Sequence, residues 1–309
     1  MSYAILFPGQ GSQFVGMGAD LFEVRADLLG EAADAVLGWS LAEMCLGGPE
    51  DLLTRTENAQ PALYATAYAL WLELAERLET APAAGAGHSL GEYIALSASG
   101  ALGFLDGLEL VAARGRAMAV AADRERSGMA ALIGGDLMAA EELVAARRES
   151  GGRLWVANIN APGQVVVAGG EEDLAWVTEN APAHGIRKAV LLKVAGAFHS
   201  PFMASAADDL AEAVSAVEFA EARFPVWANA TARPFGPDVA AGLVAQLTAP
   251  VRFSESLVSI AAAGVDTFVH VGPGDVTAAL ARRSVEGMEP VVVSSLEDVD
   301  AAVERLSAA

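Results

Sequence analysis

The sequence has few of the residues that characterise secreted, membrane-spanning or metal-binding proteins. Its single cysteine, Cys45, cannot form an internal disulfide, and its four scattered histidines lack the spacing of metal ligands. No apolar run reaches the ~18 residues of a membrane span. The N-terminal stretch lacks the basic region and long apolar core of a signal peptide. We therefore expect a cytoplasmic protein, not bound to a membrane, with no metal and no other cofactor.

Basic residues are also scarce. The chain has 19 Lys and Arg against 40 Asp and Glu, a net charge of −21, which argues against nucleic-acid binding. Residues 1–113 contain 15 acids and three bases, whereas residues 124–193 contain nine acids and eight bases. The second region can receive an acidic partner, or it can simply be a mixed solvated surface.

Hydrophobic residues make up 53% of the chain, in short strand-like runs that alternate with amphipathic segments. This alternation predicts an α/β fold with a largely parallel sheet. The expected strands are 3–7, 225–229, 267–272 and 290–295. The expected helices are 60–79, 90–99, 106–122, 203–217, 252–263, 275–284 and a last helix that reaches the C-terminus. The segment "PAAGAG" (82–87) is expected to be a poor strand, because it has no β-branched residue.

The order of elements changes in the middle of the chain. Strands are predicted at 129–134, 154–160, 164–169 and 188–194, with helices at 137–150 and 171–181. The order β-α-β-β-α-β is typical of a ferredoxin-like unit. We expect residues 124–195 to form an inserted small subdomain, and residues 1–123 and 196–309 to form one discontinuous large domain.

The stretch "GHSLGEY" (87–93) contains Gly-x-Ser-x-Gly immediately before a predicted helix. Such a strand-to-helix turn exposes the serine oxygen, and the helix N-terminus favours a developing oxyanion. Ser89 is therefore a candidate nucleophile, although small-residue turns before helices are common. His199, in a loop at the expected domain junction, is a candidate general base, with a structural histidine as the alternative. No acid is marked as its partner, so a backbone carbonyl or an amide side chain must orient it.

A second glycine-rich turn, "PGQGSQ" (8–13), follows the first predicted strand. It lacks the Gly-Lys-Ser/Thr of a phosphate-binding loop, and its glycine spacing is not that of a dinucleotide fingerprint. Its glycines allow backbone amides to approach a ligand closely.

Seven motifs together resemble the malonyl-CoA:acyl-carrier-protein transacylases, the stand-alone acyltransferases of fatty-acid and polyketide synthesis. The resemblance covers essentially the whole chain, in the order and approximate spacing of the family. The motifs are "LFPGQGSQFVGMG" (6–18), "AQPALY" (59–64), "GHSLGEY" (87–93), "RGRAM" (114–118), "NINAPGQVVVAG" (158–169), "GAFHS" (196–200) and "VGPGD" (271–275). The resemblance implies a hydrolase-like large domain with a mostly parallel sheet and a ferredoxin-like insert.

The resemblance also implies a catalytic set. Ser89 would accept malonyl from malonyl-CoA and pass it to the phosphopantetheine thiol of an acyl carrier protein, with His199 as the base. The backbone carbonyl of Gln246 would orient His199, although a surface amide late in a helix is the alternative for Gln246. Gln10 and the backbone amide of Leu90 would form the oxyanion hole.

Arg114 matches the family position that binds the free carboxylate of malonyl, for which a guanidinium offers two parallel donors. The alternative is a helix-surface arginine in an ion pair. In the related modular synthase acyltransferases, a phenylalanine before the histidine and an aliphatic residue after the serine accompany malonyl rather than methylmalonyl. Phe198 and Leu90 match this pattern, so the resemblance implies malonyl. The remaining residues that match family pocket positions are Gln60, His88, Met118 and Asn160, and His88 can equally support the turn.

Other functions on the same scaffold stay open: an editing hydrolase, a transferase of another acyl unit, or a non-catalytic module that docks a carrier protein. The motifs "FPGQGSQ", "GAFHS" and "NINAPGQ" resemble the transacylases of polyketide pathways more than those of fatty-acid synthesis. We also expect a monomer. An acidic carrier would contact local bases rather than the whole acidic surface. The candidates are Arg147, Arg148, Arg153, Arg187 and Lys188.

Overall fold

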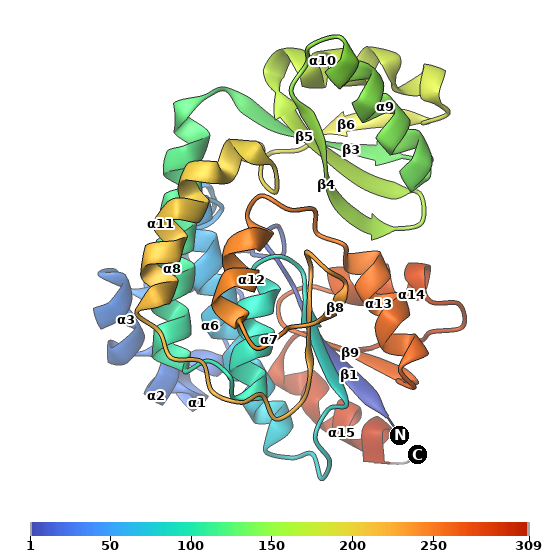
Figure 1. Cartoon of the computed structure of the whole chain (residues 1–309). Coiled ribbons are helices and arrows are strands. Elements are labelled where there is room, and N and C mark those ends of the chain that lie inside the picture. Colours follow the sequence, from blue (N-terminus) through green and yellow to red (C-terminus); the bar gives the residue numbers. More distant parts are fainter. Residues whose placement is uncertain (1, 308–309) are drawn as a thin grey trace.

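The larger part of the protein is built on a six-stranded sheet, in the order β10-β9-β1-β2-β7-β8. The computed structural model describes residues 2–307. The strands are β1 (Tyr3–Phe7), β2 (Ala84–Gly87), β7 (Val226–Ala228), β8 (Arg233–Pro234), β9 (Thr267–Val271) and β10 (Val291–Val293). All neighbouring pairs are parallel except β7 and β8. Figure 1 shows this sheet in the lower part of the molecule, with both chain ends beneath it.

Helices cover both faces of this sheet, as the side chains of β1 show. Tyr3, Ile5 and Phe7 belong to one hydrophobic core, and Ala4 and Leu6 to another. Successive strand residues point to opposite faces, so a strand buried on both sides is apolar throughout. The first core includes residues of α6 (Thr56–Ala75), α7 (Gly91–Ser99) and α8 (Phe104–Arg124). The second includes α13 (Phe253–Ala262) and α14 (Val276–Ser284).

The expectation of a poor strand at 82–87 is wrong, because Ala84–Gly87 is the fully buried strand β2 between β1 and β7. Its small residues follow from close neighbours. A Cβ on Gly87 would lie 1.9 Å from the backbone carbon of Gly91, and one on Gly85 would lie 2.9 Å from the ring of Phe224. Packing on both faces leaves no space for the β-branched side chains that strands usually prefer.

The smaller sheet is antiparallel, in the order β4-β5-β3-β6. Its strands are β3 (Ser127–Ile133), β4 (Leu154–Ala161), β5 (Gln164–Gly170) and β6 (Lys188–Leu191), and one face packs against α9 (Leu137–Glu149) and α10 (Glu171–Asn180). The order of elements and of strands is ferredoxin-like, as predicted. Figure 1 shows this unit above the larger sheet. All four strands lie within residues 124–195, and the boundaries at 124 and 195 stay a prediction.

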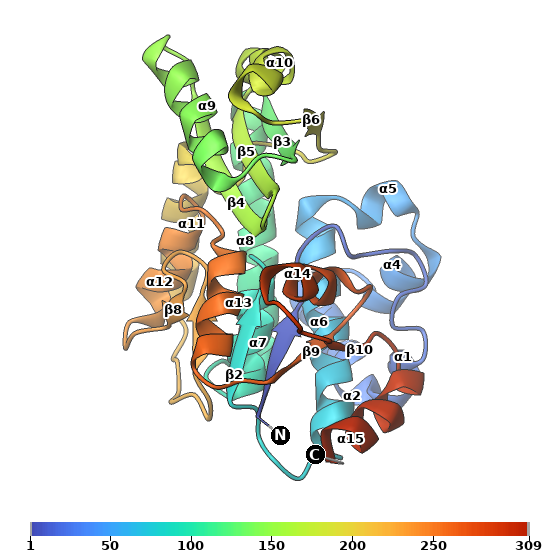
Figure 2. The same ribbon diagram turned by 90° about the vertical axis from the view of Figure 1, so that its right-hand side faces the viewer.

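The smaller sheet is joined to the larger part of the molecule by backbone hydrogen bonds to Val251, which lies outside both sheets, as well as by the chain. The N–H of Ile159 on β4 donates to the carbonyl of Val251 at 2.8 Å, and the N–H of Val251 donates to Ala157 at 2.8 Å. Helix α8 also reaches from the larger part towards the smaller sheet, as both views show (Figures 1 and 2). The small unit is therefore held beside the carboxyl ends of the parallel strands.

The other elements complete the large part of the molecule. Five short helices between the first two strands were not predicted: α1 (Leu21–Val24), α2 (Ala26–Leu29), α3 (Glu31–Leu37), α4 (Leu41–Gly47) and α5 (Glu50–Leu53). They are followed later by α11 (Ala204–Ser215), α12 (Val239–Gln246) and α15 (Val299–Ser307). Among residues 2–307, no helix is long and apolar enough to cross a membrane.

Candidate active site

Ser89 lies in a strained turn between β2 and α7. Its φ is +52°, in the left-handed region that non-glycine residues rarely adopt. Gly91 brings the helix against the end of β1, because a Cβ there would lie 2.6 Å from the carbonyl oxygen of Phe7. The turn therefore presents Ser89 at the carboxyl ends of the strands, where parallel α/β sheets bind ligands.

His199 contacts the serine directly. Its Nε2 lies 2.8 Å from Ser89 Oγ, and its Nδ1 lies 3.0 Å from the backbone carbonyl oxygen of Gln246. The carbonyl can only accept, so Nδ1 carries the proton and Nε2 is left to accept the serine proton. The geometry is that of an activated serine whose base is oriented by a carbonyl instead of a carboxylate.

His199 is neutral at ordinary pH. Burial lowers its pKa to about 3, and the nearby cation of Arg114 acts in the same direction, whereas the hydrogen bond to Gln246 opposes them. A neutral imidazole is the form that accepts a proton, so the base is in its working state over a wide pH range.

We expect the rate of Ser89 acylation to be nearly constant between pH 5 and 7. An ordinary histidine would lose its activity as the pH falls through about 6.5, whereas His199 gains a proton only as the pH approaches 3. The rate of acyl-enzyme formation, measured in single turnovers by quench and mass spectrometry, checks this. A fall with a midpoint near pH 6.5 would contradict it.

Arg114, on α8, is buried beside the nucleophile, with 1% of its surface exposed. One Nη donates to Gln60 Oε1 at 2.7 Å, and the other donates to Ser89 Oγ and Gln246 Oε1, both at 2.9 Å. All three acceptors are neutral, and Nε has no hydrogen-bond partner among the described residues. Burial lowers the pKa of Arg114. A buried guanidinium with only neutral partners and a free N–H is suited to bind a carboxylate from outside.

A cavity of about 850 Å³ opens onto these groups. Most of the residues predicted from the sequence line it: Gln10, His88, Ser89, Leu90, Arg114, Met118, Asn160, Phe198 and His199. Gln60 and Gln246 lie behind Arg114 and contact it through their side chains. Among residues 2–307, the backbone N–H groups of Gln10 and Leu90 have no hydrogen-bond partner. Two such donors beside a nucleophile can stabilise an oxyanion.

Five of the predicted site residues also support the cavity wall. His88 Nε2 lies 2.8 Å from Asn160 Oδ1, which joins the serine turn to β4 of the smaller sheet. Gln60 Nε2 donates to Met118 Sδ at 3.4 Å. The side chain of Gln10 donates to Thr56 at 3.1 Å. These contacts hold both walls of the cavity in place around Ser89.

Sequence reasoning missed two buried residues. Asn229 accepts the N–H of Ser89 at 2.7 Å and donates to the carbonyl of Gly87 at 2.8 Å. Glu92 accepts from the backbone N–H of Asn229 and, at 2.5 Å, from Gln246 Nε2. Both could have been found from the sequence. Asn229 ends a predicted parallel strand, where ligands bind, and Glu92 is an acid one helical turn after the nucleophile.

The Glu92 carboxyl is fully buried. Burial raises its pKa to about 8, while the hydrogen bonds from Asn229 and Gln246 and the charge of Arg114 act in the opposite direction. A folded-state pKa above the ordinary value means that stability declines as the pH rises from about 4.5 through 8. Because burying a carboxyl group costs free energy, its presence beside Ser89 points to a role in the site.

A serine activated by a neutral histidine, next to oxyanion donors and a buried arginine, defines an enzyme that transfers acyl groups through a serine ester. Among the described residues, no group of three or more His, Cys, Asp or Glu can hold a metal ion. The chain belongs to the family described as the acyl transferase domain, whose model matches residues 5–302.

Named relatives support this assignment. The chain is 39% identical over 307 residues to the malonyl CoA-acyl carrier protein transacylase of Bacillus subtilis, covering 98% of this chain and 96% of that protein. It is 38% identical over 284 residues to the polyketide biosynthesis malonyl CoA-acyl carrier protein transacylase BaeC of Bacillus velezensis, covering 90% and 95%. A solved malonyl-transacylase in complex with its type II polyketide acyl-carrier protein superposes with a TM-score of 0.94, at 34% identity, covering 99% and 100%.

Proposed function

We propose that this enzyme moves malonyl from malonyl-CoA to the phosphopantetheine thiol of an acyl carrier protein, through a malonyl-Ser89 ester. One observation carries the proposal: a guanidinium nitrogen of Arg114 lies 2.9 Å from Ser89 Oγ. An acyl group attached to that oxygen therefore has the cation within reach of its far end. Among acyl groups, one that ends in a carboxylate matches this arrangement.

The first half-reaction forms the ester. Ser89 Oγ attacks the thioester carbonyl carbon while His199 Nε2 takes the serine proton, and the N–H groups of Gln10 and Leu90 donate to the oxyanion. The intermediate collapses, the carbon–sulfur bond breaks, and His199 returns its proton to the departing CoA thiolate. The 2.8 Å contact between Ser89 and His199 is short enough for direct proton transfer.

The second half-reaction reverses these roles. The carrier thiol gives its proton to His199 as its sulfur attacks the malonyl ester, and the proton passes to Ser89 when the ester bond breaks. No oxidant or cofactor enters either step. The cavity must admit the phosphopantetheine arm in both halves, and its volume of about 850 Å³ provides the space.

Arg114 selects the acyl group by charge. The carboxylate of malonyl would accept from two donors of the guanidinium, one of them the free Nε–H. An acyl group without a carboxylate leaves the buried cation with neutral partners only. The cavity-lining side chain of Phe198 limits substituents at the α-carbon. One methyl group discriminates by only ~1–3 kcal/mol, so exclusion of methylmalonyl is partial.

The alternatives are less well supported by the site. An editing hydrolase that releases uncharged acyl groups has no use for a buried Arg114 aimed at the ester position. A non-catalytic docking module has no use for a hydrogen-bonded pair of Ser89 and His199. Hydrolysis of acetyl-carrier protein that is faster than malonyl transfer would favour the editing function.

Acylation of the intact protein tests the proposal. After incubation with malonyl-CoA, mass spectrometry is expected to find a malonyl adduct on the peptide that contains Ser89. Addition of a phosphopantetheinylated carrier protein is expected to remove the adduct and produce malonyl-carrier protein. Folded protein that never acquires the adduct would exclude the mechanism.

We further propose that the carrier protein docks beside the small sheet. Of the five bases considered, Arg147 pairs with Asp173 and Arg153 pairs with Glu125. Arg148 lies over the ring of Trp155. Among the described residues, Arg187 and Lys188 are exposed and form no ion pair. They precede Leu192, Lys193 and Val194, which line the cavity.

Replacing Arg187 and Lys188 by glutamate is expected to raise the KM for an acidic carrier protein several-fold, because like charges then oppose docking. Steady-state transfer assays measure this, with acylation by malonyl-CoA unchanged. Arg305→Glu is a matched control, because α15 lies at the opposite end of the molecule from the small sheet (Figure 1). An unchanged carrier KM in the double variant would place the docking face elsewhere.

We propose that the enzyme serves a polyketide pathway rather than fatty-acid synthesis. The residues of its sequence motifs support this, although the relatives include transacylases with and without polyketide in their names. Comparison of a polyketide and a fatty-acid carrier protein as acceptors tests this. We also propose a monomer, since one chain supplies Ser89, His199 and Arg114.

A further inference from the structure

Within residues 2–307, Glu92 is the acid whose carboxylate hydrogen-bonds to residues that contact Ser89 and Arg114, and the acyl-transfer steps do not use it. It belongs to α7 and has no exposed surface. Both of its oxygens accept from N–H donors, one from the backbone of Asn229 and the other from the side-chain amide of Gln246. Two donors converging on a carboxylate satisfy a group that is otherwise costly to bury.

The Gln246 side chain connects Glu92 with Arg114. Its Nε2 donates to Glu92 Oε2 at 2.5 Å and to the backbone carbonyl of Ser89 at 2.8 Å. Its Oε1 accepts from Arg114 at 2.9 Å. The amide thus lies between a buried carboxylate and a buried cation. Its NH₂ donor faces the carboxylate of Glu92, and its oxygen acceptor faces the guanidinium of Arg114.

We propose that Glu92 is a positioning residue that sets the orientation of the Gln246 amide and thereby holds Arg114 where it can bind the acyl carboxylate. The ionised carboxylate, which predominates above about pH 8, can only accept, so it compels the NH₂ of Gln246 to face it and leaves Oε1 for the guanidinium. If the amide were reversed, its NH₂ would face Arg114, and two donors would oppose each other.

This inference rests on the proposed function and deepens it, because it assigns the selectivity of the enzyme to a chain of three residues. The same Gln246 contributes its backbone carbonyl to His199 through a different atom. Loss of the Glu92 carboxylate should therefore affect the recognition of malonyl more than the transfer of acyl groups in general.

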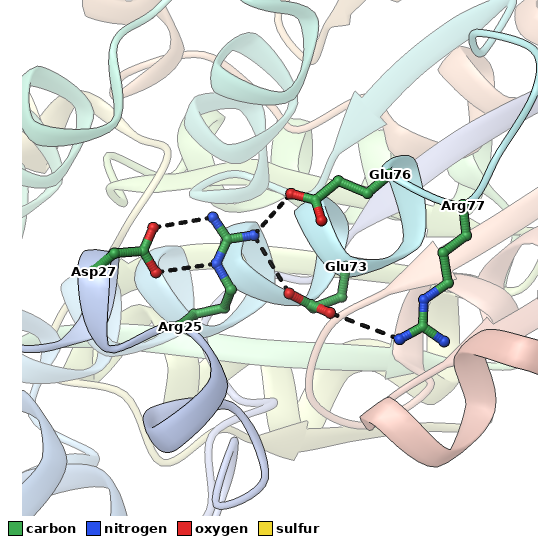
Figure 3. Close-up of polar contacts among 5 residues, drawn as sticks. All are labelled: Arg25, Asp27, Glu73, Glu76 and Arg77. Atoms are coloured by element: carbon green, nitrogen blue, oxygen red, sulfur yellow. Dashed lines mark hydrogen bonds and ion pairs between the residues drawn. The ribbon is translucent and has the colours of Figure 1, made fainter.

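A matched control is available in Glu73, a second glutamate with little exposure. It lies near the end of α6, where its oxygens approach Arg25 at 3.4 Å and Arg77 at 3.8 Å. Figure 3 shows this cluster, which also includes Asp27 and Glu76. None of the five residues lines the cavity. Glu73→Gln makes the same chemical change as Glu92→Gln, away from Ser89.

The experiment measures kcat/KM for malonyl-CoA and for acetyl-CoA at pH 8.5, above the pKa of Glu92. Glu92→Gln is expected to lower the malonyl-to-acetyl ratio about tenfold, mostly through a higher KM for malonyl-CoA, because Arg114 loses a fixed acceptor. Glu73→Gln is expected to leave the ratio unchanged. A Glu92→Gln enzyme with the native ratio would overturn the proposal.

A double-mutant cycle distinguishes positioning from a general structural effect. If Glu92 acts through Arg114, Glu92→Gln should change the ratio by less than about twofold in an Arg114→Ala background. An equal tenfold change in both backgrounds would overturn the proposal. Thermal unfolding monitors the fold of each variant.

Should Glu92→Gln not fold, Gln246→Leu removes the bridging amide and keeps the backbone carbonyl. Gln246→Leu is expected to lower the malonyl-to-acetyl ratio of kcat/KM by a similar factor. An unchanged ratio in this variant would again overturn the proposal. Failure of the proposed function is distinguishable, because the native enzyme would then form no malonyl adduct on Ser89.

Discussion

Replacement of Ser89 by alanine is expected to reduce malonyl transfer by at least about 10⁴-fold, because the covalent intermediate can no longer form. His199→Ala should cause a loss of similar size, since the serine proton would have no acceptor at 2.8 Å. Quantified transfer from malonyl-CoA to a carrier protein measures both effects.

Residues that act as one unit do not contribute additively, so the double variant should be scarcely slower than either single one. Circular dichroism and thermal unfolding check that the variants are folded. Retention of more than about one tenth of native activity in folded Ser89→Ala would be incompatible with a serine ester on this residue.

Arg114→Ala is expected to lower kcat/KM for malonyl-CoA by about 10²–10⁴-fold, because two charge-assisted hydrogen bonds of ~1.5–3 kcal/mol each are lost. Transfer of acetyl should fall little, since that group has no carboxylate for the guanidinium to bind. The enzyme would therefore change from a malonyl-selective catalyst into a slow catalyst with little preference. Competition between malonyl-CoA, methylmalonyl-CoA and acetyl-CoA, followed by mass spectrometry of the carrier protein, measures the change.

Arg116→Ala is a matched control for this prediction. Arg116 is the same residue type on the same helix, but it is exposed, whereas Arg114 is buried. It should leave both rates near their native values. If Arg114→Ala lowered malonyl and acetyl transfer by the same factor, Arg114 would act on the serine geometry and not on the acyl carboxylate.

Local sequence patterns predicted most of the regular structure. The first strand was placed at residues 3–7, as observed, and the β-α-β-β-α-β order of the small unit was also correct. Such patterns work because one strand or helix buries a repeating set of its own side chains. Strand β6 ends at Leu191, three residues before the predicted end, because the chain there turns towards the cavity.

The segment 82–87 shows where local patterns fail. Its alanines and glycines have low strand propensity, but α7 and Phe224 approach so closely that larger residues would collide with them. Strand preference measures how a side chain fits a pleated surface, and here the neighbours leave no room for one. The contact with Phe224, which lies more than a hundred positions from Gly85, is invisible in a six-residue window.

The sequence by itself determined the alternation of strands and helices, the serine turn and the candidate set of Ser89, His199 and Arg114. Only the tertiary structure decided that His199 faces the carbonyl of Gln246, and that the amide of the same residue joins Arg114 to Glu92. Glu92 and Gln246 are 154 positions apart. Hydrogen-bond partners at such a separation are selected by the packing of helices and strands around them, which no local pattern encodes.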